Sequence, residues 1–91
     1  MVARARVVFR GRVQGVYFRA HCQEKAEELG LRGYVRNQRD GTVEAVFEGE
    51  RALIEECVEW NAGRQPFASV AGADVTWETP TGEFQAFEVR R

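Results

Sequence analysis

The stretch Gly11-Arg12-Val13-Gln14-Gly15-Val16-Tyr17-Phe18-Arg19 separates two segments whose apolar residues repeat with different periods. Before it, three apolar residues alternate with arginines, which predicts a half-buried β-strand: Ala5, Val7 and Phe9. After it, four apolar residues recur at helical spacing: Phe18, Cys22, Ala26 and Leu29. The stretch is therefore predicted to connect a strand to a helix, with Gly15 in the loop between them.

A loop of this kind is suited to binding an anion. Successive backbone N–H groups can converge on one point, and the beginning of the following helix adds a positive dipole there. Arg19 is expected in the first helical turn, where a cation is slightly unfavourable unless an anion binds between it and the helix. The expected ligand is a phosphate or phosphoryl group. Spacing alone leaves an ordinary turn with a solvated arginine as the alternative.

Further patterns along the chain predict the rest of the fold. Asp40-Gly41 indicates a tight turn between two strands, and Gly30 is typical of a helix end. The expected elements are strands over 31–38, 42–48, 70–78 and 84–90 and a second helix over 50–61. In that helix Leu53, Cys57 and Trp60 form one stripe, with Ile54, Val58 and Asn61 beside it. The order β-α-β-β-α-β plus a short terminal strand predicts an α+β, ferredoxin-like sandwich, an antiparallel sheet with two helices on one face.

Composition limits the function. The 91 residues suffice for one domain, expected over 1–91. With 13 basic and 14 acidic residues, the chain lacks the basic excess of a general nucleic-acid binder. No apolar run approaches the roughly 20 residues of a membrane span, and no export signal is recognised, so a cytoplasmic protein is expected. Cys22 and Cys57 are interpreted as buried small apolar residues, and His21 as a surface residue of the first helix.

Asn37 ends the second predicted strand, just before the Asp40-Gly41 turn. Asn is common at such positions for backbone reasons alone. In a split β-α-β arrangement the first two strands run parallel, so the end of the second strand lies near a helix-end loop of the first half. Periodicity does not decide whether Asn37 reaches Arg19. The sequence offers no acidic cluster for a metal, no histidine-based nucleophile and no glycine–lysine nucleotide loop.

The chain resembles the acylphosphatases over nearly its whole length. The resemblance rests on Gly11–Arg19, Leu29–Asn37 and Asp40–Glu44 together, with Gly49 and Phe87–Arg90 in further agreement. It implies hydrolysis of acyl phosphates to a carboxylate and inorganic phosphate, with no cofactor and no metal. It also implies that Asn37 orients the attacking water and that Arg19 binds the phosphate. The phosphate-binding set it implies is Gln14, Gly15, Val16, Tyr17, Phe18 and Arg19.

Two segments depart from the family pattern. Tyr17 stands where glycine or phenylalanine is more usual, and its hydroxyl is a candidate for adjusting access or substrate preference. Gly63-Arg64-Gln65-Pro66 replaces a Gly-Pro-Pro run, which is expected to alter loop stiffness more than chemistry. The expected partner is a small acyl phosphate, with no nucleic acid or membrane, and the protein is expected to be a monomer.

The alternatives are a non-catalytic domain that binds a phosphorylated metabolite and a domain that handles carbamoyl phosphate. An RNA-binding module of the same fold is disfavoured, because the basic–aromatic motif of its open sheet face is absent.

Overall fold

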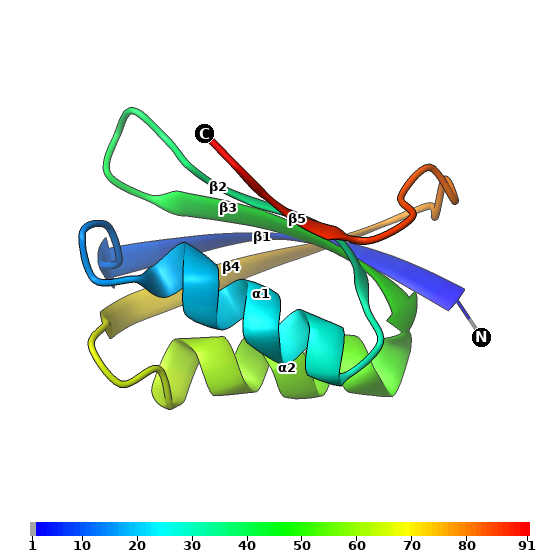
Figure 1. Cartoon of the computed structure of the whole chain (residues 1–91), viewed down its shortest axis with the longest axis horizontal. Coiled ribbons are helices and arrows are strands. Elements are labelled where there is room, and N and C mark those ends of the chain that lie inside the picture. The colour runs from blue at the N-terminus through cyan, green and yellow to red at the C-terminus, as the bar shows by residue number, and fades with distance from the viewer. Residues whose placement is uncertain (1) are drawn as a thin grey trace.

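Both helices cover the same face of one five-stranded sheet (Figure 1). The computed structural model describes residues 2–91. In chain order the elements are β1 (Val2–Arg12), α1 (Phe18–Glu28), β2 (Arg32–Asn37), β3 (Val43–Glu50), α2 (Arg51–Gly63), β4 (Ser69–Glu78) and β5 (Phe87–Arg90). This is the ferredoxin-like α+β arrangement with an additional terminal strand that the sequence predicts. Neither helix within residues 2–91 is long and apolar enough to cross a membrane.

The strands lie in the order β4-β1-β3-β2-β5. β3 pairs antiparallel with both β1 and β2, so β1 and β2 point the same way, as the split β-α-β arrangement requires. β4 pairs antiparallel with β1, whereas β5 pairs parallel with β2. The antiparallel sheet predicted from the sequence therefore holds for the first four strands, and β5 adds a parallel edge. The chain reaches the same end of the sheet after β1, after β2 and after β5.

The core lies between the sheet and the two helices. The predicted alternation in β1 is confirmed, because Ala5, Val7 and Phe9 are fully buried. Two aromatic contacts lie in the core: Phe9 of β1 and Phe18 of α1 join the sheet to a helix, with ring centroids 5.0 Å apart, and Phe47 of β3 stacks on Phe87 of β5 at 5.4 Å. Besides these, the core includes Val13, Val16, Cys22, Ala26, Leu31, Val35, Val43, Ala45, Ile54 and Cys57. Both cysteines are free and buried, as predicted.

Three expectations need correction. α2 buries Ile54, Cys57 and Asn61, so the face toward the core is shifted from the stripe through Leu53 and Trp60, which are only half-buried. His21 is half-buried rather than a free surface residue, and its Nδ1 is a buried atom without a hydrogen-bond partner.

The last strand begins at Phe87 rather than at residue 84. Phe84 is buried away from the ladder, where its ring lies 5.9 Å from that of Tyr34 and beneath the Arg4 guanidinium. Side-chain contacts hold this segment, so its apolar residue does not signal strand pairing.

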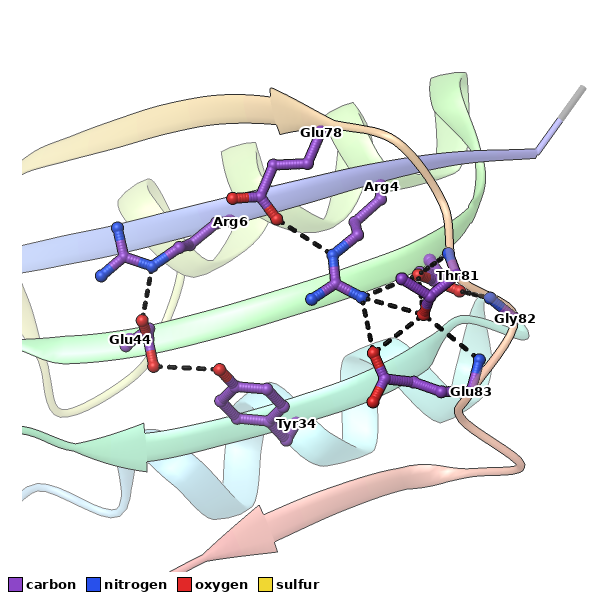
Figure 2. Close-up of polar contacts among 9 residues, drawn as sticks. Arg4, Arg6, Tyr34, Glu44, Glu78, Thr81, Gly82 and Glu83 are labelled. Carbon is purple, nitrogen blue, oxygen red and sulfur yellow. Dashed lines mark hydrogen bonds and ion pairs between the residues drawn. The ribbon is translucent and has the colours of Figure 1, made fainter.

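The central strand β3 is buried on both faces. Its helix-facing residues are apolar, but its open face carries Glu44 and Glu48, which are only 3% and 5% exposed. Glu44 accepts hydrogen bonds from Arg6, Arg36 and Tyr34, two of which are drawn in Figure 2. Buried carboxylates require such partners, because an unpaired buried charge is strongly unfavourable.

Glu48 organises the connection between β4 and β5. Its carboxylate accepts hydrogen bonds from the backbone N–H groups of Thr81 at 2.9 Å and Gly82 at 3.1 Å. It also forms an ion pair with Arg4 at 2.9 Å (Figure 2). The same arginine reaches Glu83 at 3.1 Å, which ties the loop to β1. Residues 79–86 are thus fixed across the open face of the sheet before β5 begins.

These contacts set the titration of the carboxylates. Burial by itself would raise the pKa of Glu44, but hydrogen bonds from Arg36, Arg6 and Tyr34 lower that pKa below its usual value. The pKa of Glu48 is lowered in the same way, by the Thr81 N–H and Arg4 against the opposing effect of burial. A carboxyl whose folded pKa is depressed stabilises the fold above its unfolded pKa of about 4.3. That stabilisation is lost as the pH falls through the folded value.

We expect Glu44→Gln to lower the free energy of unfolding by about 1–3 kcal/mol at pH 7, the scale of hydrogen bonds to charged groups. The difference from wild type is expected to be smaller at an acid pH below the depressed folded pKa of Glu44 than at pH 7, because the wild-type carboxyl is then protonated as well. Urea denaturation of both proteins at the two pH values measures this difference in the free energy of unfolding. Glu59→Gln, at an exposed carboxylate of α2, is the control. An equal loss at both pH values contradicts the assignment of the stabilisation to the charge.

Candidate active site

The connection between β1 and α1 presents its backbone N–H groups without internal acceptors. None of the main-chain hydrogen bonds that residues 2–91 form outside the helices and strands uses an N–H of loop residues 14–17 as donor. Two of these residues have positive φ angles, Gly15 at 73° and Tyr17 at 60°. A β-carbon at Gly15 would meet no atom within 4 Å, so its surroundings are open. Such a run of free N–H groups is a typical anion-binding concavity.

The N-terminus of α1 adds further donors. Tyr17 occupies the N-cap position, where its side chain makes no capping hydrogen bond, and the first turn contains no acidic residue. The first N–H groups of the helix and the positive end of its dipole are therefore not neutralised by a carboxylate of that turn. Phe18 fixes this end of the helix by packing its ring on Phe9 of β1.

Arg19 lies in the first turn of α1, as predicted. One terminal nitrogen of its guanidinium donates to the main-chain carbonyl of Arg90 in β5 at 3.0 Å. Gln23, one turn later, donates to the carbonyl of Phe87 at 3.0 Å. The terminal strand thus holds the same face of α1 that carries Arg19, and the guanidinium keeps further N–H groups for a ligand.

Asn37 ends β2 at the same end of the sheet as this loop. Its register partner on β3 is Val43, which also pairs with Phe9 of β1. The side chain of Gln14 joins the loop to the β2–β3 hairpin by donating to the carbonyls of Gln38 at 2.8 Å and Thr42 at 2.9 Å. The predicted Asp40-Gly41 turn closes that hairpin, with Thr42 bonded to the Asp40 carboxylate.

A single cavity of about 520 Å³ brings most of the candidate residues together. Gly15, Tyr17, Phe18, Arg19 and Asn37 all line it. The cavity also takes in residues from α1 and from the end of the chain: Val13, Ala20, Gln23, Val89 and Arg91.

The remaining two candidates, Gln14 and Val16, do not line this cavity. Val16 is buried in the core, and the Gln14 side chain is used for the hairpin. Only their backbone N–H groups remain as possible contributors to anion binding.

Sequence reasoning missed the contribution of β5 and of the α2–β4 connection. Arg91 and Val89 reach the site because β5 runs parallel to β2, which brings both strand ends to the same edge. Gln65 is buried and donates to the carbonyl of Phe18 at 3.0 Å and to Asn61 at 2.8 Å. The parallel direction of the last strand is a property of the fold that local sequence patterns do not show, and Gln65 left no local signal either.

No group of three or more His, Cys, Asp or Glu side chains within residues 2–91 is placed to hold a metal ion. Fold and cavity together define a small α+β protein whose site is built from hydrogen-bond donors around a strand–loop–helix connection.

Comparison with known proteins gives the family. The acylphosphatase family model matches residues 5–89. An acylphosphatase of Pelotomaculum thermopropionicum is 48% identical over 87 residues, covering 96% of this chain and 95% of that protein. One from a Roseiflexus species is 50% identical over 88 residues, covering 97% and 95%. The crystal structure of acylphosphatase from Bacillus subtilis superposes with a TM-score of 0.92 at 33% identity, covering all of both chains.

These matches show that the chain belongs to the acylphosphatase family. The resemblance found in the sequence is confirmed, and with it the enzyme class, a hydrolase that acts on acid anhydrides.

We expect Gln14→Leu to remove the link between the hairpin and the loop, so that both still fold but shift relative to each other. Loss of its two hydrogen bonds is expected to lower stability by about 1–2 kcal/mol. Misplacement of Asn37 is expected to lower kcat for acetyl phosphate by about ten- to a hundredfold. Thermal melts and initial rates measure both effects, with the exposed Gln85→Leu as control. Reduced stability with a wild-type kcat would mean that the bridge is structural only.

Proposed function

We propose that this acylphosphatase binds the phosphoryl group of its substrate in the β1–α1 loop and hydrolyses it without a metal ion. The free N–H groups of residues 14–17 and the start of α1 would donate to the phosphoryl oxygens. Arg19 would supply the cation, since its guanidinium fork matches a phosphate and its other edge is anchored on Arg90. Charge-assisted hydrogen bonds of this kind contribute about 1.5–3 kcal/mol each.

Asn37 is the proposed positioning group for the attacking water. It approaches the cavity from β2, a different element from the loop that carries the phosphate-binding groups. The water oxygen forms a bond to phosphorus while the bond from phosphorus to the acyl oxygen breaks, and the carboxylate leaves with the electron pair. Held in line, the water avoids the entropy cost of a bimolecular encounter. Donors around the phosphoryl oxygens stabilise the charge that they carry in the transition state.

The cavity lining supports a mechanism without a side-chain base. The side chains that line it within the described chain include no carboxylate, imidazole or thiol. The resemblance implies that the substrate phosphate itself takes the proton of the water. A mixed anhydride has a good leaving group, so positioning and charge stabilisation suffice.

The observation that carries the proposal is that Arg19 and Asn37, which are far apart in sequence, line one cavity. The monomeric state and cytoplasmic location expected from the sequence remain predictions.

We expect the protein to release inorganic phosphate from benzoyl phosphate at the same rate with and without EDTA. The reason is that the proposed phosphate-binding groups are all backbone N–H groups and an arginine. A colorimetric phosphate assay measures the rate. Loss of activity in EDTA that is restored by a divalent cation would overturn the metal-free mechanism. Phosphate binding without turnover would favour the non-catalytic domain instead.

We expect Arg19→Ala and Asn37→Ala to change different kinetic constants of the enzyme. Arg19→Ala removes phosphate binding and charge stabilisation together, so KM is expected to rise roughly 10- to 100-fold, with a lower kcat and weaker inhibition by inorganic phosphate. Asn37→Ala is expected to keep phosphate inhibition and to lower kcat by roughly 10²–10⁴. Steady-state kinetics with phosphate as inhibitor separates the two.

Arg32→Ala is the control for the loss of one positive charge, because Arg32 is exposed at the opposite end of β2. A wild-type kcat in Asn37→Ala would refute the role given to that residue. Unchanged phosphate inhibition in Arg19→Ala would refute the phosphate site.

A further inference from the structure

Two large aromatic side chains stand exposed beside the cavity. Tyr17 is 72% exposed and Phe67, in the connection between α2 and β4, is 61% exposed. Their ring centroids lie 6.2 Å apart in a T-shaped contact, and the half-buried His21 ring, one helical turn after Tyr17, lies 6.0 Å from that of Phe67. Exposed aromatic rings gathered at one place on a small protein indicate a binding surface. Because Tyr17 also lines the cavity, this surface is continuous with the site.

The pair is held in place by the backbone on both sides. Gln65, two residues before Phe67, is buried and bonded to the carbonyl of Phe18 and to Asn61, so the connection is fixed against the β1–α1 loop. Tyr17 adopts the left-handed conformation, φ 60° and ψ 23°, which is unfavourable for a bulky residue. Strain of this kind gathers at functional sites. The two rings are thus presented by rigid segments rather than by loose loops.

Three connections lie one below another at this end of the molecule, at the left of Figure 1. The β2–β3 hairpin is at the top, the β1–α1 loop in the middle and the α2–β4 connection below. Contacts confirm the order. Gln14 joins the middle loop to the hairpin, and Tyr17 joins it to Phe67. The hairpin that follows Asn37 and the connection that carries Phe67 therefore lie on opposite sides of the β1–α1 loop.

In phosphoryl transfer the attacking and leaving oxygens are roughly in line on opposite sides of phosphorus. If water approaches from the Asn37 flank, the acyl group leaves toward the flank that carries Tyr17 and Phe67. An apolar ring surface there offers nothing to a short polar acyl group but can stack on a flat one.

We propose that Tyr17 and Phe67 bind the acyl group of the substrate and make the enzyme selective for acyl phosphates of aromatic carboxylic acids. The inference rests on the proposed function and deepens it, because it assigns the half of the substrate that the phosphate site does not contact. Phe67 does not line the cavity itself, and its ring reaches the site through its contact with the Tyr17 ring.

The test compares benzoyl phosphate with acetyl phosphate in wild type, Phe67→Ala and Phe67→Leu. We expect the ratio of kcat/KM for benzoyl phosphate to that for acetyl phosphate to fall by about three- to tenfold in Phe67→Ala, the size of one aromatic contact. Phe67→Leu keeps apolar bulk without the ring and is expected to fall in between. Val75→Ala, which truncates another exposed apolar side chain on β4, is the matched control and is expected to keep the wild-type ratio.

A wild-type ratio in Phe67→Ala would overturn the acyl-site assignment while leaving the proposed function intact. Hydrolysis of neither substrate by the wild-type protein would overturn the proposed function, and this inference with it. Thermal melts confirm that each variant is folded, which the exposure of Phe67 favours. A fall of the ratio in Val75→Ala equal to that in Phe67→Ala would also count against the assignment, because the effect would then not belong to this surface.

Discussion

The antiparallel pairing of β3 with both of its neighbours is the constraint on which the site depends. It forces β1 and β2 to run in the same direction, so the chain leaves both strands at one end of the sheet. Val43 of β3 pairs with Phe9 of β1 on one side and with Asn37 of β2 on the other. This register fixes where β1 and β2 end relative to each other along the sheet. The loop that presents free N–H groups and the asparagine expected to hold the water are therefore placed by main-chain register, before any side-chain contact is considered.

The same central strand explains how so small a protein stabilises a sheet with one face uncovered by helices. Apolar residues fill the helix side, and on the other side Glu44 and Glu48 are enclosed by arginines, a tyrosine and backbone N–H groups. Each carboxylate joins several strands or connections at once. Paired charges of this kind contribute orientation as much as energy, because their geometry admits few alternatives.

Local patterns in the sequence were enough for the layers and for part of the site. Alternation located β1, helical spacing located α1, and Asp40-Gly41 located the hairpin, because each depends on neighbours a few residues away. The start of β5 was misplaced because Phe84 is held by contacts with distant residues. Gln65 bonds to Phe18 across 47 positions, a separation over which no period or spacing carries information.

The anchoring of Arg19 on β5 has a consequence for how this enzyme fails under heat. β5 is the shortest strand and lies at the sheet edge, paired along one side only. Edge segments open locally at a lower free energy than central strands do. When β5 detaches, the arginine loses the carbonyl that aligns it, although the remaining four strands keep their ladder. Because the proposed phosphate-binding arginine depends on the four residues of β5, we expect inactivation on warming to precede global melting.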